Sequence, residues 1–252
     1  KLPALARPAF GALRTVAAQT PGDAARIGAL GASNVSVCGN LKFDVTPASE
    51  KILLGRSWRE AVGQRPVWLA ASTREGEEEL VLTAWRKLAV PDALLVLVPR
   101  HPQRFGAVAE LLAHEKISFG RRSEGLPDSE TQVWLGDSMG EMAAYYTLAD
   151  VAFIGGSLLP LGGQNLIEAA ACGCPAIVGP HTFNFLQATE DAIAAGAARR
   201  VEGEAGLAAA ISQAFGNAGE LAEMRTAALR FAAAHSGATE RTVAVIRAAI
   251  AE

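Results

Sequence analysis

Glycines, amides and a carboxylate lie close together in residues 155–168, where they have the chemistry to bind an anion and a sugar. The stretch reads GGSLLPLGGQNLIE. Where glycine removes Cβ, backbone N–H groups can approach a ligand closely, and the first N–H groups of a following helix favour negative charge. Glu168 is placed to accept hydrogen bonds from a sugar diol. A tight strand-to-helix turn that needs glycine explains the same residues, so both interpretations stay open. The spacing matches neither the dinucleotide-binding fingerprint nor the P-loop.

Charged side chains follow another apolar run, at residues 94–98. Arg100 and His101 come directly after it. An arginine can form a two-pronged contact with a phosphate or a carboxylate, and a histidine can donate to the same anion. Solvated charge at a loop is the alternative interpretation. His181 follows the apolar run 175–178, where either a structural or a functional role is open to it.

The loop at residues 136–142 (GDSMGEM) combines glycine with acids and a hydroxyl. We expect Asp137 or Ser138 to cap the helix that follows. Gly140 would let a ligand approach the first turn of that helix. Glu141 is either a ligand contact or a surface acid beside the helix dipole.

The elements that would position these loops alternate between strand and helix. Strands are predicted for short apolar runs, at residues 67–71, 94–98, 117–119, 132–135, 151–154, 175–178 and 198–201, and helices for the stretches between them. Continuous apolar runs are typical of strands buried on both faces. The predicted fold class is therefore α/β, with a Rossmann-like, doubly wound parallel sheet. In such a sheet ligands bind beyond the carboxyl ends of the strands. After the first strand, we expect Ser72 or Thr73 to cap the next helix.

The first forty residues form a separate piece. A strand within 14–19, a helix that begins after Thr20, and a strand at 35–38 predict the tail of an N-terminal domain, residues 1–40. Residues 41–48 are predicted to be a linker, because Pro47 favours extended backbone before it. The main domain is predicted over 49–235 and begins with a helix at 49–62, and a last helix occupies 236–252. Because the chain opens on Lys1 in what resembles mid-domain sequence, we expect a longer protein.

Composition narrows the classes of function. With 50% hydrophobic and 19% charged residues, the 252-residue chain can bury a sizeable core. A net charge of −3 gives no support for nucleic-acid binding. Three cysteines cannot close a disulfide framework, so we expect reduced thiols in the cytoplasm, and we expect neither a membrane span nor a signal peptide. No Ser-His-Asp set, zinc-ligand spacing or paired-carboxylate motif stands out, which favours a metal-independent nucleotide-sugar site.

Taken in order, these loops resemble the 3-deoxy-D-manno-octulosonic acid (Kdo) transferases of lipopolysaccharide synthesis. The resemblance covers about the whole chain, and its specificity comes from the combination of motifs. They are AQT at 18–20, GNLKFD at 39–44, STREGEE at 72–78, PRHPQR at 99–104, GDSMGEM at 136–142, GGSL at 155–158, GGQN at 162–165 and GPHTFNF at 179–185.

The resemblance implies a GT-B glycosyltransferase, an enzyme with two Rossmann-like domains. It implies inverting transfer of Kdo from CMP-Kdo to a lipid A precursor at the cytoplasmic face of the bacterial inner membrane, with no metal and no cofactor. This chain would be mostly the C-terminal, donor-binding domain, and residues 1–40 would be the tail of the acceptor domain. The general base and the membrane-associating segments would belong to the missing N-terminal part, so the fragment alone is expected to be inactive.

Site residues follow from the same resemblance, position by position. Arg100 would hold the donor's phosphate or the Kdo carboxylate, Glu168 the ribose hydroxyls, and Lys42 would line the cleft. The donor-binding set is then Arg100, His101, Gly136, Ser138, Met139, Gly140, Glu141, Gly156, Ser157, Gly163, Gln164, Asn165 and Glu168. Gln164 and Arg74 stand where histidine is frequent in the family, so their individual contacts depart from its pattern.

Three alternatives remain from the residues alone. The chain could belong to another GT-B transferase, to a UDP-sugar epimerase, or to a nucleotide-binding module without catalysis. In GT-B proteins the last helix crosses to the other domain. We therefore expect residues 236–252 to be frayed, or packed on a neighbouring chain, when that domain is missing.

Overall fold

The computed structural model describes residues 3–90 and 92–251. These residues form two compact units. One consists of residues up to Val45 together with those from Ala232 onward, and the other runs from Thr46 to Phe231. Each unit is described by itself.

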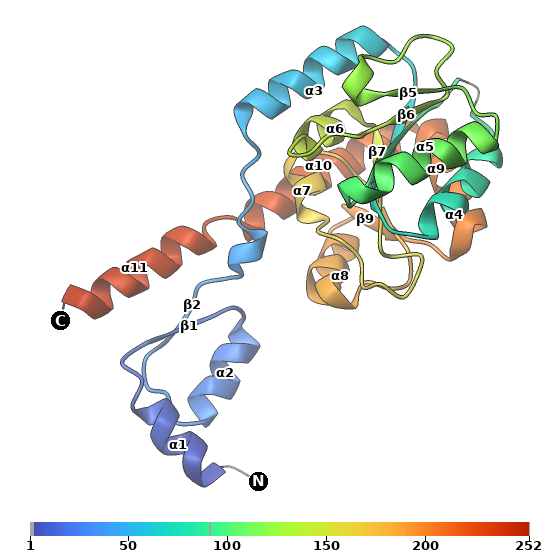
Figure 1. Cartoon of the computed structure of the whole chain (residues 1–252). Coiled ribbons are helices and arrows are strands. Elements are labelled where there is room, and N and C mark those ends of the chain that lie inside the picture. The colour runs from blue at the N-terminus through green and yellow to red at the C-terminus, as the bar shows by residue number, and fades with distance from the viewer. Residues whose placement is uncertain (1–2, 91, 252) are drawn as a thin grey trace. The chain divides into compact units, whose positions relative to one another are not determined.

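The larger unit is built on a seven-stranded sheet in which every neighbouring pair is parallel (Figure 1). The strand order is β5-β6-β4-β3-β7-β8-β9, so β3 lies at the centre. The strands are β3 (Val67–Thr73), β4 (Leu94–Pro99), β5 (Phe119–Arg121), β6 (Val133–Leu135), β7 (Val151–Ile154), β8 (Ala176–Val178) and β9 (Ala198–Arg200). This sheet confirms the predicted fold class.

The central strands are buried on both faces because their residues are apolar without interruption. In β3 the side chains of Trp68, Leu69 and Ala70 are fully buried, and the same holds for residues 94–97 of β4. Trp68 pairs with Leu95 on one side and with Val151 on the other. The register therefore brings three apolar runs into one continuous layer.

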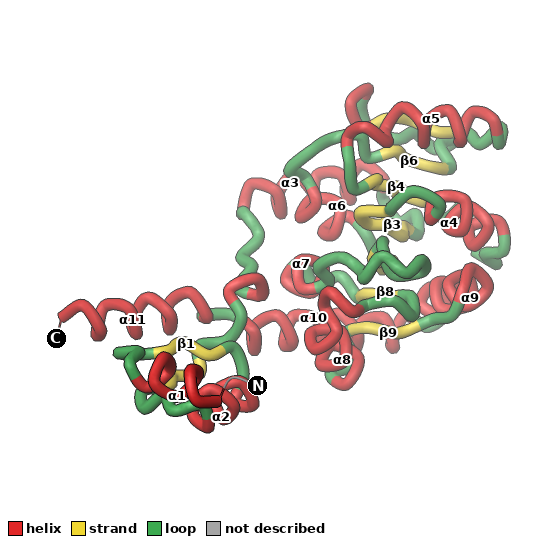
Figure 2. Tube along the Cα trace, turned by 60° about the horizontal axis from the view of Figure 1, so that its bottom comes forward, coloured by secondary structure: helices red, strands yellow, loops and turns green. Residues whose placement is uncertain are grey.

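Helices cover both faces of this sheet (Figure 2). Helices α4 (Glu77–Arg86), α5 (Phe105–His114) and α9 (Gly203–Gly216) contribute Val81, Leu112 and Ile211 to one core cluster with Trp68 and Phe153. The other helices of the unit are α3 (Ser49–Val62), α6 (Met142–Leu148), α7 (Ile167–Ala171), α8 (Leu186–Ala194) and α10 (Ala218–His235), with 3-10 turns η2 (Pro102–Arg104), η3 (Arg122–Glu124) and η4 (Phe183–Phe185).

Helices α3 and α6 approach each other closely on the other face. A Cβ at Gly55 would meet the backbone oxygen of Ala144, so only glycine fits there. Beside that contact the rings of Trp58, Trp134 and Tyr145 form a cluster, with 5.1 Å between the centroids of Trp58 and each of the other two. This packing fixes the start of α6 against the end of β6.

The smaller unit contains α1 (Pro3–Gly11), β1 (Val16–Ala18), α2 (Pro21–Ala29), β2 (Val35–Val37), the 3-10 turn η1 (Leu41–Phe43) and α11 (Ala238–Ala251). Strands β1 and β2 are parallel, as expected for a βαβ piece. Thr20 caps α2 as predicted, because its side chain accepts a hydrogen bond from the Asp23 N–H. Helix α1 was not predicted.

The last helix, α11, is held to this unit at its first turn. The carboxylate of Asp44 accepts hydrogen bonds from Gly237 N (2.8 Å) and Thr239 N (2.7 Å). Further along, Val243, Ile246 and Ile250 are exposed. The helix is formed as far as Ala251, so the expected fraying is not seen over the described residues, and packing on a neighbouring chain stays a prediction. Within residues 3–90 and 92–251, no helix combines the length and apolarity needed to cross a bilayer.

Candidate functional site

The strand order divides the carboxyl edge of the sheet at β3. From β3 the chain moves through β4 to β5 and β6 on one side, and it returns to place β7, β8 and β9 on the other. Such a reversal of strand order is where open α/β sheets bind ligands, because the loops on either side turn away from each other. The residues predicted to bind the donor lie in the loops that follow β4, β6 and β7, with Glu168 at the start of α7.

The loop after β3 is shaped by its backbone. Ser72 adopts a left-handed φ of 57°, and the pairing register shifts between Ala71 and Thr73. Helix α4 then begins after Gly76, which has a φ of 86° and makes no side-chain cap. The expectation that Ser72 or Thr73 caps α4 is therefore wrong. Thr73 instead donates its hydroxyl to a carboxylate oxygen of Glu78, 3.1 Å away.

Glu77 is a fully buried acid at this edge. Its Oε2 accepts hydrogen bonds from Arg74 N (3.0 Å) and Gly156 N (2.5 Å), and its Oε1 accepts one from Leu158 N (3.1 Å). Two amides of the glycine-rich turn therefore hold the protein's own carboxylate. Sequence reasoning missed this role, because Glu77, Glu78 and Glu79 are adjacent in the chain and nothing in their spacing separates the buried acids from the exposed one.

Ser157 joins the loops after β7 and β8. Its buried hydroxyl donates to Ile154 O (2.5 Å) and accepts from Gly179 N (2.8 Å). The amide of Gly156 and the hydroxyl of Ser157 are thus used inside the protein. Their assignment to donor binding stays a prediction, one that would rest on the shape of the turn rather than on these groups.

The second half of the same loop keeps its backbone donors available. Gly163 donates its N–H to Gly156 O (2.7 Å), but the N–H groups of Gln164, Asn165 and Leu166 have no acceptor within the described part of the chain. Asn165 accepts a hydrogen bond from Ile167 N (3.0 Å) and so orients the start of α7. Consecutive unpaired amides of this kind can bind an anion.

Glu168 lies next to these amides, on the first turn of α7. Asn165 donates its side-chain N–H to Glu168 Oε1, 3.4 Å away. Burial raises the pKa of the Glu168 carboxyl, while the amide of Asn165 and the positive charge of Arg100 oppose that rise. The charge of Arg100, from the loop after β4, and a hydrogen bond from the β7–α7 loop therefore act on the same carboxylate.

The loop after β4 contains two arginines with different surroundings. Arg100 donates its backbone N–H to Thr73 O (2.9 Å), and its exposed guanidinium has no hydrogen-bond or ion-pair partner among residues 3–90 and 92–251. Arg104 lies 3.2 Å from Glu78 and 3.4 Å from Glu75. His101 is exposed at the start of η2. Of the two arginines, Arg100 is therefore the one whose guanidinium is available to an incoming anion.

The loop after β6 is fixed by hydrogen bonds between polar side chains and by one to the backbone. Ser138 donates to Glu141 Oε2 (2.5 Å), and Arg122 donates to Glu141 Oε1 (3.2 Å). Asp137 accepts from the backbone and hydroxyl of Ser123. The expectation that Asp137 or Ser138 caps α6 is therefore wrong, since both side chains bind elsewhere.

Glycines give this loop its shape and leave one apolar side chain on its surface. A Cβ at Gly136 would lie 2.6 Å from Val98 Cγ2 and 2.9 Å from Tyr145 Oη, so no side chain fits. Gly140 has a φ of 74°, and Met139 is 59% exposed. The loop therefore presents an apolar surface on a rigid base. Such a surface is suited to the flat face of a nucleobase.

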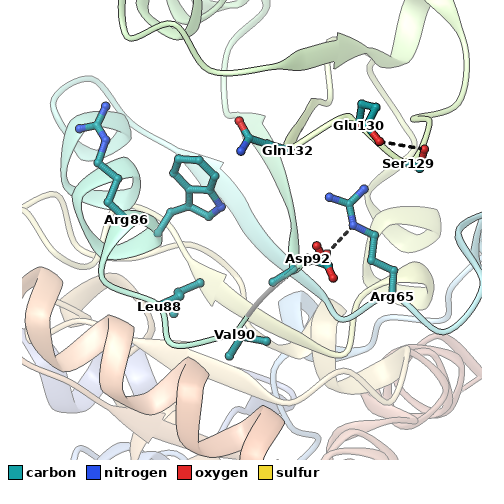
Figure 3. A pocket seen from close by; sticks show the side chains of 10 residues that line it. Arg65, Arg86, Leu88, Val90, Asp92, Ser129, Glu130 and Gln132 are labelled. Carbon is teal, nitrogen blue, oxygen red and sulfur yellow. Dashed lines mark hydrogen bonds between the residues drawn. The ribbon is translucent and has the colours of Figure 1, made fainter.

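Lys42 belongs to η1 of the smaller unit, and its side chain lies outside the part of the chain that the structure describes. The hollow shown in Figure 3, about 500 Å³ in volume, is lined by residues that precede β3, β4 and β6, such as Arg65, Asp92 and Gln132. It therefore opens at the amino end of the strands, opposite the predicted site.

The thiols do not form a metal site or a disulfide among the described residues. Cys38, Cys172 and Cys174 are free. Burial raises the pKa of the Cys172 thiol to about 11, which keeps it protonated at neutral pH. Within the described ranges, no three His, Cys, Asp or Glu side chains are grouped so that they could hold a metal ion.

Known proteins are similar to this chain in sequence and in structure. Residues 1–45 match the family described as 3-deoxy-D-manno-octulosonic-acid transferase. A 3-deoxy-D-manno-octulosonic acid transferase from Bordetella pertussis is 46% identical over 94% of this chain. The crystal structure of the C-terminal CMP-Kdo binding domain of WaaA from Acinetobacter baumannii is 30% identical, superposes with a TM-score of 0.66, and is matched over 98% of its length and 76% of this chain. The chain belongs to the Kdo transferase family.

The comparisons also show how much of the length of a Kdo transferase this chain covers. It covers 57% of the length of the Bordetella relative, so it spans little more than half of such a protein. A more distant structure, Anabaena Alr3699/HepE in complex with UDP-glucose, is 13% identical with a TM-score of 0.59 over 95% of this chain. That likeness concerns the fold alone, and it agrees with a GT-B glycosyltransferase domain.

Proposed function

We propose that this chain is the donor-binding part of a Kdo transferase that moves Kdo from CMP-Kdo to a lipid A precursor. The proposal is supported by one observation above the others. The guanidinium of Arg100 and the amides of Gln164, Asn165 and Leu166 have no partner among the described residues and lie at one edge of the sheet. Arg100 and Asn165 both act on the pKa of the nearby Glu168 carboxyl. A donor with a phosphate, a sugar carboxylate and a ribose diol needs this combination.

Each group has a chemical task in this proposal. The amides of Gln164 to Leu166 bind the phosphate of CMP, since unpaired N–H groups beside a helix start stabilise negative charge. Glu168 accepts hydrogen bonds from the ribose hydroxyls, and Met139 packs on the cytosine. Arg100 binds the Kdo carboxylate or the phosphate through its planar fork.

These groups favour departure of CMP as the acceptor oxygen attacks. The bond between Kdo and the phosphate oxygen breaks, negative charge grows on that phosphate, and the amides and Arg100 stabilise it without a metal ion. Attack from the opposite face gives inversion at the sugar carbon. We propose that the general base, the lipid acceptor site and the contact with the cytoplasmic face of the inner membrane belong to parts of the protein beyond this chain.

Calorimetric titration of the chain with CMP tests the proposal. We expect saturable binding of CMP, and weaker binding of UMP, which differs in the Watson–Crick edge of its base. Absence of heat at millimolar CMP would contradict donor binding at this edge. Preference for UMP or UDP would instead favour another GT-B transferase or a UDP-sugar epimerase.

A further inference from the structure

The glycine-rich turn after β7 is folded around a carboxylate that the chain itself supplies. Glu77 is completely buried and receives three backbone hydrogen bonds, two of which come from Gly156 and Leu158. Buried carboxylates are rare unless their charge is compensated, and convergent N–H groups provide that compensation. An oxygen of Glu77 therefore occupies the position that a bound anion would take in an empty turn.

The surrounding backbone leaves no room for another arrangement of this turn. A Cβ at Gly155 would meet Ser72 O and would lie 2.8 Å from Thr73 Cα, so the turn lies directly on the β3 loop. Gly156 has a φ of 70°, in the left-handed region. The two amides that face Glu77 are thus held by backbone contacts on one side and by its carboxylate on the other.

The hydrogen bonds of this turn also restrict the residues that precede and orient the amides of 164–166. Gly156 O accepts a hydrogen bond from Gly163 N (2.7 Å), and Gly163 directly precedes the unpaired N–H of Gln164. Ser157 O accepts from His181 N (3.0 Å), which joins the loop after β8 to the same turn. Hydrogen bonds therefore link the carboxylate of Glu77 both to the second half of the loop after β7 and to the loop after β8.

We propose that Glu77 is a positioning residue, which sets the amides of residues 164–166 for the donor's phosphate without touching it. The inference rests on the proposed function, because it concerns the same edge of the sheet. It also assigns the anion of the Gly155–Leu158 turn to the protein, so the phosphate binds in the second half of the loop rather than the first.

The neighbouring acids supply a matched control. Glu79 is in the same turn of α4 and is exposed, so Glu79→Gln makes the same chemical change without touching the β7 loop. Glu77→Gln keeps the shape of the side chain but replaces one acceptor oxygen with an N–H₂ group, which faces an amide donor. Leaving a buried donor without an acceptor makes an equilibrium constant less favourable by about tenfold.

The test combines amide hydrogen exchange with CMP titration on the whole chain. In Glu77→Gln we expect exchange at Gly156 and Leu158 to be at least about tenfold faster, exchange at Leu69 and Val96 in the central strands to be unchanged, and the Kd for CMP to rise about tenfold. Glu79→Gln should leave all three as in the wild type. In Glu77→Ala, sodium acetate should restore protection at Gly156, and sodium chloride at the same ionic strength should not.

The outcomes separate the role of Glu77 from the proposed binding of CMP. Unchanged exchange at Gly156 and Leu158 in Glu77→Gln would overturn the role of Glu77. Faster exchange with an unchanged Kd would show that Glu77 shapes the turn without positioning the site, which also overturns the proposal. If the wild type binds no CMP, the proposed function fails, whereas the exchange rates still decide whether Glu77 is the anion of this turn.

Discussion

The guanidinium of Arg104 lies 3.2 Å from the carboxylate of Glu78, a side chain with no exposure to solvent. Arg100, four residues earlier in the same loop, has no such partner among the described residues. The loop after β4 thus uses one arginine to neutralise a buried acid and leaves the other available to a ligand. The two residues are therefore expected to respond differently to substitution.

Arg104→Met should reduce the free energy of unfolding by about 3 kcal/mol at neutral pH, because it leaves a buried charge without its partner. Burial already raises the pKa of Glu78, and Arg104 opposes that rise. Without the arginine the folded-state pKa rises further above the unfolded value. The loss is therefore complete at neutral pH and shrinks as the pH falls through the raised pKa, where Glu78 is protonated.

Urea unfolding at pH 7 and at pH 5 measures this effect. Arg86→Met is the control, since Arg86 and Glu115 form a partly exposed pair that is worth less than about 1 kcal/mol. An equal loss in the two variants, or a loss at Arg104 that does not change with pH, would contradict the buried pair.

Arg100→Ala should leave the free energy of unfolding within about 0.5 kcal/mol of the wild type, because the guanidinium of Arg100 forms no hydrogen bond or ion pair with the described residues. The Kd for CMP or CMP-Kdo should rise about 10- to 100-fold, the range expected for a lost charge-assisted hydrogen bond. Titration calorimetry and thermal unfolding give the two quantities. Arg86→Ala removes the same charge at the opposite edge and should not change the affinity.

Gly155→Ala should destabilise the protein by about 1–3 kcal/mol, because the new methyl group would overlap Ser72 O in the β3 loop. That corresponds to a fall in Tm of roughly 2–4 °C for each kcal/mol. Gly106→Ala in α5 adds the same methyl group where nothing lies within 4 Å, so it should be neutral or stabilising. Calorimetric scans of both variants settle the comparison, and equal Tm values would contradict the close contact.

Acidification should weaken binding of the nucleoside through Glu168. Burial raises the pKa of this carboxyl, so it is protonated at a higher pH than an ordinary glutamate and then loses acceptor capacity for the ribose diol. Cytidine is the suitable ligand, because the phosphate of CMP titrates near pH 6 itself. Between pH 7 and pH 5 the affinity of the wild type should fall, while that of Glu168→Gln should stay flat.

Much of the fold could be predicted from the sequence because the strands are continuous apolar runs. Helix α3 and strand β7 begin and end at the predicted residues, Ser49 to Val62 and Val151 to Ile154. Strand β5 lies two residues beyond its prediction, at Phe119–Arg121 instead of 117–119, because this edge strand is only half-buried and its polar residues hide its position.

The polar contacts of the site were harder to predict. Ser72, Thr73, Asp137 and Ser138 have the residue types of helix caps, yet all four take other roles. A cap depends only on nearby residues, whereas Asp137 binds Ser123, which lies 14 residues earlier in the chain and is brought to it by the fold. Glu77 has the same property to a greater degree, because two of its three amide partners come from the turn after β7.

Glu77 precedes Gly156 by 79 residues and Leu158 by 81. During synthesis from the N-terminus, α4 therefore leaves the ribosome well before the amides of Gly156 and Leu158, which donate hydrogen bonds to this acid, exist. Until β7 pairs with β3, Glu77 must stay hydrated, and the two halves of the sheet edge cannot close over it. Glu77 thereby imposes an order of folding, since its burial has to follow the pairing of β7, the last of the central strands.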